Sequence, residues 1–183
     1  MSNTTRPVQE TLFDLGPDKE VGYRVPTACQ VANITYRQLD YWARTDLVVP
    51  SIRSARGSGS QRLYSFKDIL VLKIVKGLLD TGISLQNIRQ AVEKLRDLGV
   101  EDLATITLVS DGTTVYECRS AEEVIDLLGG GQGVFGIAVP GIMKELTGSI
   151  SAFPHERVNQ DSDTAMIVAE DELAARRRRR NAS

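Results

Sequence analysis

The side chains with the clearest chemical potential are the cationic ones in the first half of the chain. Residues 21–98 contain twelve lysines and arginines against six aspartates and glutamates, whereas residues 99–154 contain two against eight. The overall net charge of −2 conceals this division. Arginine suits polyanions, because its planar guanidinium matches phosphate oxygens and the acceptor edge of guanine. The charge pattern therefore indicates a nucleic-acid-binding part followed by an acidic part with another role.

Other kinds of chemistry find little support. The single histidine, His155, lies near the start of a polar tail, and the two cysteines, Cys29 and Cys118, are far apart. These residues predict no zinc site, no disulfide framework and no pair of nucleophile and base. The glycine-rich run at 129–133 lacks the Gly-Lys-Ser/Thr ending of a phosphate loop and follows a helical pattern, which favours a helix stop and linker. We expect no enzyme activity, no cofactor and no metal.

The location follows from the apolar pattern. No run approaches the roughly 18 apolar residues of a membrane span, and the N-terminus lacks the apolar stretch of a signal peptide. A cytoplasmic, nucleoid-associated protein is therefore expected.

Helix starts can be read from a recurring pattern of Ser or Thr followed three residues later by Glu, Gln or Asp. The pattern opens at four residues: Thr27, Thr35, Ser65 and Ser120. In the first half we expect helices at 27–32, 35–45 and 66–79 and from 84 to about 98. The first two, joined by a tight turn at Asn33, predict a helix-turn-helix. The arginine- and glycine-rich stretch at 51–62 predicts a β-hairpin with a cationic tip.

The second half has a different character. Asp111-Gly112 is a strong hairpin signal between strand-like segments at 105–109 and 113–118. A short acidic helix at 120–128, a buried strand at 134–139 and an amphipathic stretch at 142–146 follow. The expected fold is mainly α with a small α+β part. Its expected divisions are a disordered N-terminus at 1–20, a winged helix-turn-helix domain at 21–98, an α+β dimerisation or effector domain at 99–154, and a disordered tail at 155–183 that includes the run from Arg176 to Arg180.

Three segments of residues 23–98 resemble the winged helix-turn-helix domain of the MerR family of transcription regulators. One is the helix run Ile34-Thr35-Tyr36-Arg37-Gln38-Leu39-Asp40-Tyr41-Trp42, followed by Leu47 and Pro50. The second is the wing closure Arg62-Leu63-Tyr64-Ser65. The third, Gly82-Ile83-Ser84-Leu85-Gln86-Asn87-Ile88-Arg89, is similar to the family's Gly-Phe-Ser-Leu-x-x-Ile motif. They agree with the family in order and spacing, and the chain as a whole is similar to a divergent actinobacterial branch with an atypical C-terminal domain.

Some residues depart from the family pattern. Asp40 stands before Tyr41 where the family often has arginine, and an acidic side chain cannot attract a phosphate, which weakens the case for a backbone contact there. Asp46 replaces a usual glycine, and the wing is a few residues longer than typical. The long helix by which such regulators usually dimerise is not visible after Leu98, where the β-rich segment stands instead.

The charge pattern and the resemblance together suggest contacts with double-stranded DNA. A recognition helix presents its first residues to base edges, so the base-contact candidates are Tyr36, Arg37 and Gln38. The phosphate-contact candidates are Tyr41, Arg53, Arg56 and Arg62. The resemblance also implies a homodimer on an inverted repeat in a promoter, RNA polymerase as a partner and, as in several members, distortion of an overlong promoter spacer. The sequence identifies no small-molecule effector.

Two other functions remain open. An architectural or excisionase-like protein would bend DNA with low sequence specificity, whereas a regulator should prefer its site by at least ~10³ over other DNA. A protein-interaction adaptor would bind a partner through residues 99–154 and show negligible DNA affinity at moderate salt. The run from Arg176 to Arg180 fits non-specific DNA binding and a solvated tail equally well.

Overall fold

The computed structural model describes residues 21–54, 61–129 and 135–157. Three expectations fall on other residues and lie outside the described ones: the disordered N-terminus, the wing tip with Arg56, and the tail from Arg176 to Arg180. The described elements are mainly helical, with two small antiparallel sheets, which confirms the expected fold class.

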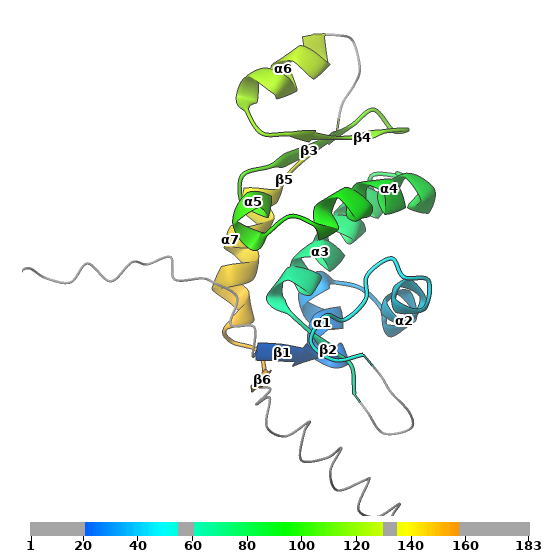
Figure 1. Ribbon diagram of the computed structural model, residues 1–183, viewed down its shortest axis with the longest axis vertical. Coiled ribbons are helices and arrows are strands. Elements are labelled where there is room, and N and C mark those ends of the chain that lie inside the picture. The colour runs from blue at the N-terminus through cyan, green and yellow to red at the C-terminus, as the bar shows by residue number, and fades with distance from the viewer. Residues whose placement is uncertain (1–20, 55–60, 130–134, 158–183) are drawn as a thin grey trace, which may run out of the picture.

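The first half of the described chain forms four helices beside a short-stranded sheet (Figure 1). In chain order the elements are β1 (Val21–Arg24), α1 (Val25–Ala32), α2 (Tyr36–Arg44), β2 (Leu63–Tyr64), α3 (Phe66–Asp80) and α4 (Leu85–Arg96). Helix α3 buries eight of its fifteen residues, and α1, α4 and β1 all pack against it. It is therefore the central helix that positions the others.

Capping explains where three of these helices begin. The hydroxyl groups of Thr35 and Ser65 accept hydrogen bonds from the amides of Gln38 and Asp68, whose side chains accept in return from the cap amides. Both are therefore capping boxes, as predicted. The hydroxyl of Ser84 caps α4 in the simpler way, by accepting from the amide of Asn87.

The expected start of the first helix at Thr27 was wrong. Helix α1 begins two residues earlier, after Arg24, and Thr27 is buried within it. The reason is Pro26 in the first turn, because its fixed φ already suits a helix and the turn needs no amide from it. The turn after α1 is as expected, since Asn33 adopts the left-handed conformation with φ 54°.

The second half of the chain adds a second sheet and three helices. Its elements are α5 (Val100–Leu103), β3 (Thr107–Ser110), β4 (Val115–Cys118), α6 (Ala121–Gly129), β5 (Phe135–Ala138), α7 (Val139–Ile150) and β6 (Glu156–Arg157). Strands β3 and β4 form the expected hairpin, with Gly112 at φ +89° in its turn. The carboxylate of Asp111 accepts hydrogen bonds from the amides of Thr114 and Thr113, which hold the pKa of Asp111 at about 2. Helix α5 was not foreseen.

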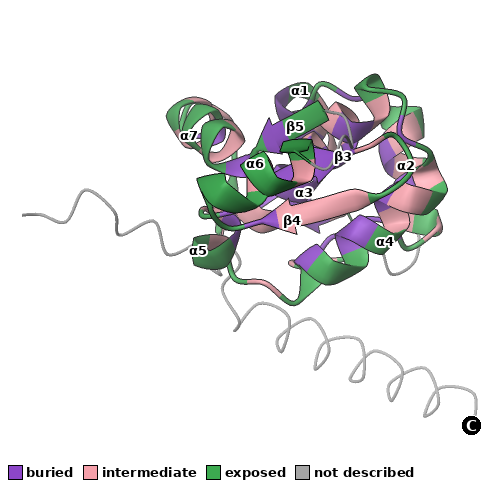
Figure 2. Ribbon diagram, turned by 90° about the horizontal axis from the view of Figure 1, so that it is seen from above, coloured by how far each residue is buried: buried purple, intermediate pink, exposed green. Residues whose placement is uncertain are grey.

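Strand β5 is not the buried strand that the apolar run at 134–139 predicted. Ile137 is its only buried residue, and the other three are exposed. The sheet order β4-β3-β5 explains this, because β5 is an edge strand whose inward face alone reaches α3. Helix α6 lies on the other side of the sheet and buries no residue, as its green colour in Figure 2 shows.

Helix α7 returns the chain to the first half. It is longer than the amphipathic stretch expected at 142–146, and it packs against α3 and α1 (Figure 1). Beyond it, β6 pairs with β1 through Val21–Arg157 and Gly22–Glu156. The first sheet therefore has the order β2-β1-β6. Residues 155–157 were expected in a disordered tail, but their strand pairing and an ion pair between Arg24 and Glu156 hold them in place.

The two halves share one apolar core. A single cluster of buried side chains runs from Tyr23 through α3 to Leu108, Ile137 and Leu146. The division into domains at residue 98 remains a prediction, and the residues on both sides of it stabilise each other. None of the helices described is long and apolar enough to span a membrane.

Candidate nucleic-acid interface

The outer face of α2 gathers the predicted base contacts. The inner face buries Leu39 and Trp42 against the core, as the spacing of apolar residues predicted. The opposite face therefore points to solvent, where Tyr36 is 63% and Tyr41 48% exposed, and Arg37 is exposed beside them. Large aromatic side chains are seldom so exposed without a partner, and here they stand beside a guanidinium.

Gln38 has a structural task in addition to any contact with bases. Its side-chain oxygen accepts hydrogen bonds from the amide of Thr35 at 2.9 Å and from the hydroxyl of Thr35 at 3.1 Å. The oxygen is therefore occupied by the helix cap, and only the amide nitrogen of Gln38 is free to reach a ligand.

The base of the wing is tied to α2 by an ion pair. Arg62 donates to Asp40 at 2.9 Å, and both side chains are only about a fifth exposed, at 20% and 19%. Arg44 also pairs with Asp40 from the next turn of α2. The hydrogen bond from Arg62 is the largest influence on Asp40 and lowers the pKa of its carboxyl. Asp40 therefore joins the wing to the helix, a role that its position in the sequence did not indicate.

The wing strands themselves are held by backbone pairing. The amide of Arg53 donates to the carbonyl of Leu63 at 3.2 Å, and the amide of Leu63 donates back at 2.9 Å. Within the described residues, Nε of Arg53 and the hydroxyl of Tyr64 are buried without a hydrogen-bond partner. Burial raises the pKa of Tyr64 to about 12. The predicted phosphate contact Arg56 belongs to the wing tip, outside the described residues.

Two arginines of α4 hold the far end of α2, a contact that could not be predicted from the sequence. Arg89 donates to the carbonyl of Thr45 at 2.6 Å, and Arg96 donates to the carbonyls of Asp46 and Leu47. Asp46 has φ 56°, the left-handed conformation that explains why glycine is usual at this position. At the C-terminal end of α2 the last backbone carbonyls lack helical partners and carry partial negative charge. The positive charges of the two arginines are therefore favourable there.

Comparison with known proteins identifies the family. The model of the MerR HTH family of regulatory proteins matches residues 23–95. A relative from Mycobacterium tuberculosis and another from Mycobacterium bovis are each 72% identical over 177 residues, which cover 96% of this chain and 78% of the relative. The chain belongs to the MerR family. Both relatives are described as uncharacterized HTH-type transcriptional regulators.

Other matches cover only part of the chain. The HTH-type transcriptional regulator GlnR of Bacillus cereus is 34% identical over 62 residues, which cover 34% of this chain and 45% of GlnR. A crystal structure of a MerR-family transcriptional regulator from Bacillus cereus is 28% identical and covers 44% of this chain and 57% of its own, with a TM-score of 0.36. As a MerR-family transcriptional regulator, the chain has double-stranded DNA as its partner.

Among the residues that the structure describes, no three His, Cys, Asp or Glu side chains cluster in a way that could hold a metal ion. Cys29 is half-buried in α1 and Cys118 is buried at the end of β4. Burial raises the pKa of both thiols, which disfavours the thiolate needed for metal binding or nucleophilic attack.

Proposed function

We propose that this MerR-family chain is a sequence-specific regulator that binds an inverted-repeat promoter site as a homodimer. The observation that carries the proposal is the outer face of α2, where Tyr36, Arg37 and Tyr41 are exposed on a helix whose other face is fixed in the core. A helix anchored in this way presents a rigid surface to the major groove.

Individual roles follow from the contacts. Arg37 and Tyr36 read base edges, and a bidentate arginine–guanine pair contributes about 1–3 kcal/mol of discrimination. Gln38 assists through its free amide nitrogen. Tyr41 and Arg53 bind phosphates beside the helix and the wing, and Arg56 does so from the wing tip.

Arg62 has a shared role in this proposal. Only 20% of its side chain is exposed, and Asp40 already neutralises its charge. Its main effect is to set the angle between wing and recognition helix, and it reaches a phosphate only through a guanidinium nitrogen that Asp40 leaves free.

Residues 99–154 supply the dimer contact in the proposal. Helix α4 ends at Arg96 and is followed by a turn and the four-residue α5, so no long helix extends from the winged part in the described residues. The exposed edge strand β5 and the unburied helix α6 are surfaces that a second copy would cover. Two-fold symmetry would match an inverted repeat.

Distortion of the promoter and a contact with RNA polymerase belong to the same proposal. Bending a DNA site of about 20–30 base pairs costs of order 1–6 kcal/mol. Contacts from the wing would have to offset this cost. The protein would act in the cytoplasm, on the nucleoid.

Two measurements test this function: the ratio of specific to non-specific DNA affinity, and the mass of the protein in solution. The full chain should bind its selected site at least ~10³ more tightly than an unrelated duplex of equal length at the same salt. Sedimentation at micromolar concentration should show a dimer. A ratio near one would favour an architectural protein, and a monomer at every concentration would exclude the homodimer.

A further inference from the structure

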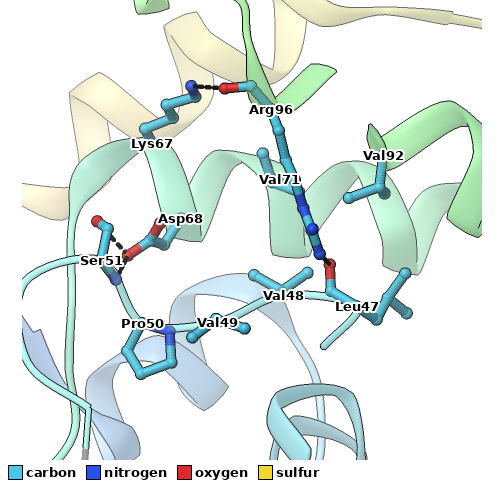
Figure 3. A pocket seen from close by; sticks show the side chains of 10 residues that line it. All are labelled: Leu47, Val48, Val49, Pro50, Ser51, Lys67, Asp68, Val71, Val92 and Arg96. Atoms are coloured by element: carbon cyan, nitrogen blue, oxygen red, sulfur yellow. Dashed lines mark hydrogen bonds between the residues drawn. The ribbon is translucent and has the colours of Figure 1, made fainter. Parts of the chain in front are cut away.

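A cavity lies directly behind the end of the recognition helix. It has a volume of about 380 Å³ and is formed by the segment after α2, the first turns of α3 and the last turns of α4 (Figure 3). This volume lies within the range of about 300–1,000 Å³ that small-molecule sites occupy. The cavity could not be predicted from the sequence, because its walls come from three segments that are separated along the chain.

The walls are apolar. Val48, Val71 and Val92 are buried around the cavity, and Val49 stands at its edge with 42% of its surface exposed. Pro50 adds a further apolar side. Such walls favour an apolar ligand body over water.

Two cations share the cavity, and neither has an acidic partner in the described parts of the chain. Lys67 donates one hydrogen bond, to the backbone carbonyl of Arg96 at 2.6 Å, and Arg96 extends along the cavity toward Leu47 (Figure 3). No ion pair involves either side chain in the ranges described. Both retain N–H groups that are free to bind an anion.

The one acidic side chain of the lining is held against the wall by hydrogen bonds to one of its oxygens. A carboxylate oxygen of Asp68 accepts hydrogen bonds from the amide and the hydroxyl of Ser51 and from the amide of Ser65, each at 2.8 Å. These three donors fix the carboxylate against the wall and offset its negative charge. The cavity therefore offers two cations against one carboxylate, whose three hydrogen bonds all fall on the same oxygen.

We propose that this cavity binds a small carboxylic acid with an apolar body. The body would occupy the space between Val48, Val71 and Val92, and the carboxylate would take hydrogen bonds from the guanidinium of Arg96. The ammonium of Lys67, at the other end of the Arg96 side chain (Figure 3), would add to the attraction through its charge. Binding of the acid does not depend on the proposed function.

Arg96 connects the cavity to the recognition helix. The guanidinium that would bind the ligand also holds the carbonyls of Asp46 and Leu47, at the end of α2. A carboxylate bound to the remaining N–H groups would draw the guanidinium away from these carbonyls and loosen the end of the helix. Ligand and DNA should therefore each weaken the binding of the other by the same factor, about fivefold or more. This second step rests on the proposed function.

Octanoate is a suitable probe, with octanol and octylammonium as controls of equal chain length. Calorimetric titration of the full chain without DNA should show saturable binding of octanoate and none of octylammonium. Octanol, which lacks the charge, should bind at least about tenfold more weakly than octanoate. Equal binding of all three, or of none, would overturn the site.

Variants locate the probe. Lys67→Gln should weaken the binding of octanoate about tenfold. Val49→Glu adds a carboxylate at the edge of the cavity that competes with octanoate for the cations, so this variant should not bind octanoate. Lys94→Gln is the matched control, because Lys94 is an exposed cation of the same part of α4 that does not line the cavity. Each variant should keep the helical circular dichroism of the parent. Unchanged octanoate binding in Lys67→Gln and Val49→Glu would overturn the proposal.

A separate titration with DNA tests the coupling. Saturating octanoate should reduce the affinity of the full chain for its selected site about fivefold or more, and Val49→Glu should not respond. If octanoate binds but leaves DNA affinity unchanged, the coupling through Arg96 is wrong and the site stands. If Lys67→Gln weakens DNA binding and not octanoate binding, the cations serve phosphates and the site itself is wrong. Failure of any specific DNA binding would instead count against the proposed function.

Discussion

A methyl group added at Gly77 should reveal how tightly the second sheet packs on α3. A Cβ at this position would lie 3.0 Å from Cδ1 of Ile137, the buried residue of β5. Gly77 is inside α3, where glycine costs a helix about 1 kcal/mol relative to alanine. The close approach of the strand is therefore the physical reason for a glycine here.

Two opposing effects set the expected size of the change. Alanine gains up to about 1 kcal/mol of helix propensity, while overpacking typically costs about 1–3 kcal/mol. Only the terminal methyl of Ile137 has to move, so the cost should lie at the low end. Gly77→Ala should therefore change the free energy of unfolding by less than about 1 kcal/mol. Ile137→Val removes the same terminal methyl and alone should destabilise by about 0.5–1.5 kcal/mol.

The double variant is the decisive one, because the alanine methyl would occupy the space that Ile137→Val vacates. It should be more stable than the two single changes predict by about 1–2 kcal/mol. Urea unfolding, followed by the fluorescence of Trp42, the only tryptophan, measures all four proteins. The control pairs Ile137→Val with Gly148→Ala, a helical glycine with open space around it, and should be additive. Additivity within about 0.5 kcal/mol for Gly77 as well would refute the packing of β5 on α3.

Four further outcomes concern α2 and the wing. Asp40→Asn frees Arg62 and Arg44, so the slope of log affinity against log salt for non-specific DNA should steepen by about 0.9 per phosphate gained; an unchanged slope would contradict this. Because the hydrogen bond from Arg62 lowers the pKa of Asp40, the pair stabilises the fold at neutral pH. This stabilisation is lost as the pH falls through the lowered pKa, and urea unfolding of Asp40→Asn should not show that loss. Burial raises the pKa of Tyr64 to about 12, so the contribution of this side chain to the free energy of unfolding is complete below pH ~10 and declines toward pH ~12. Tyr64→Phe should remove this alkaline decline in stability. Arg89→Met should lower the free energy of unfolding by about 1–2 kcal/mol and weaken DNA binding, because the carbonyl of Thr45 loses its donor, whereas Lys94→Met should do neither.

Elements governed by local contacts could be predicted from the sequence. The starts of α2 and α3 depend on Thr35 and Ser65 bonding to amides three residues away, and the β3–β4 turn depends on Asp111-Gly112. The exposure of Tyr36 also follows from helical spacing once Leu39 and Trp42 are taken as core.

Features that join distant segments could not be predicted. Strand β6 pairs with β1 across more than 130 residues, and its two residues, Glu156 and Arg157, show no strand pattern. The apolar run around Ile137 resembles a buried strand, because the sequence does not show that β5 lies at a sheet edge.

The candidate interface divides in the same way. Arg37 and Tyr41 could be assigned to an outer helix face, whereas the pairing of Arg62 with Asp40 joins residues 22 positions apart. The support of α2 by Arg89 depends on how α4 packs, which periodicity alone does not determine. The second task of Gln38 was predicted, since the Thr-x-x-Gln pattern that starts the helix also engages its side chain.

Selection of genomic DNA fragments by the purified full chain, followed by sequencing, tests most directly whether α2 reads base sequence. The parent protein should enrich one inverted repeat. Arg119→Gln, a cation of the second half that pairs with Glu117, should enrich the same repeat. Arg37→Gln should lose or change the preference at one base pair of each half-site, by about 1–3 kcal/mol. An unchanged motif with Arg37→Gln, or no motif with the parent protein, would contradict recognition through this helix.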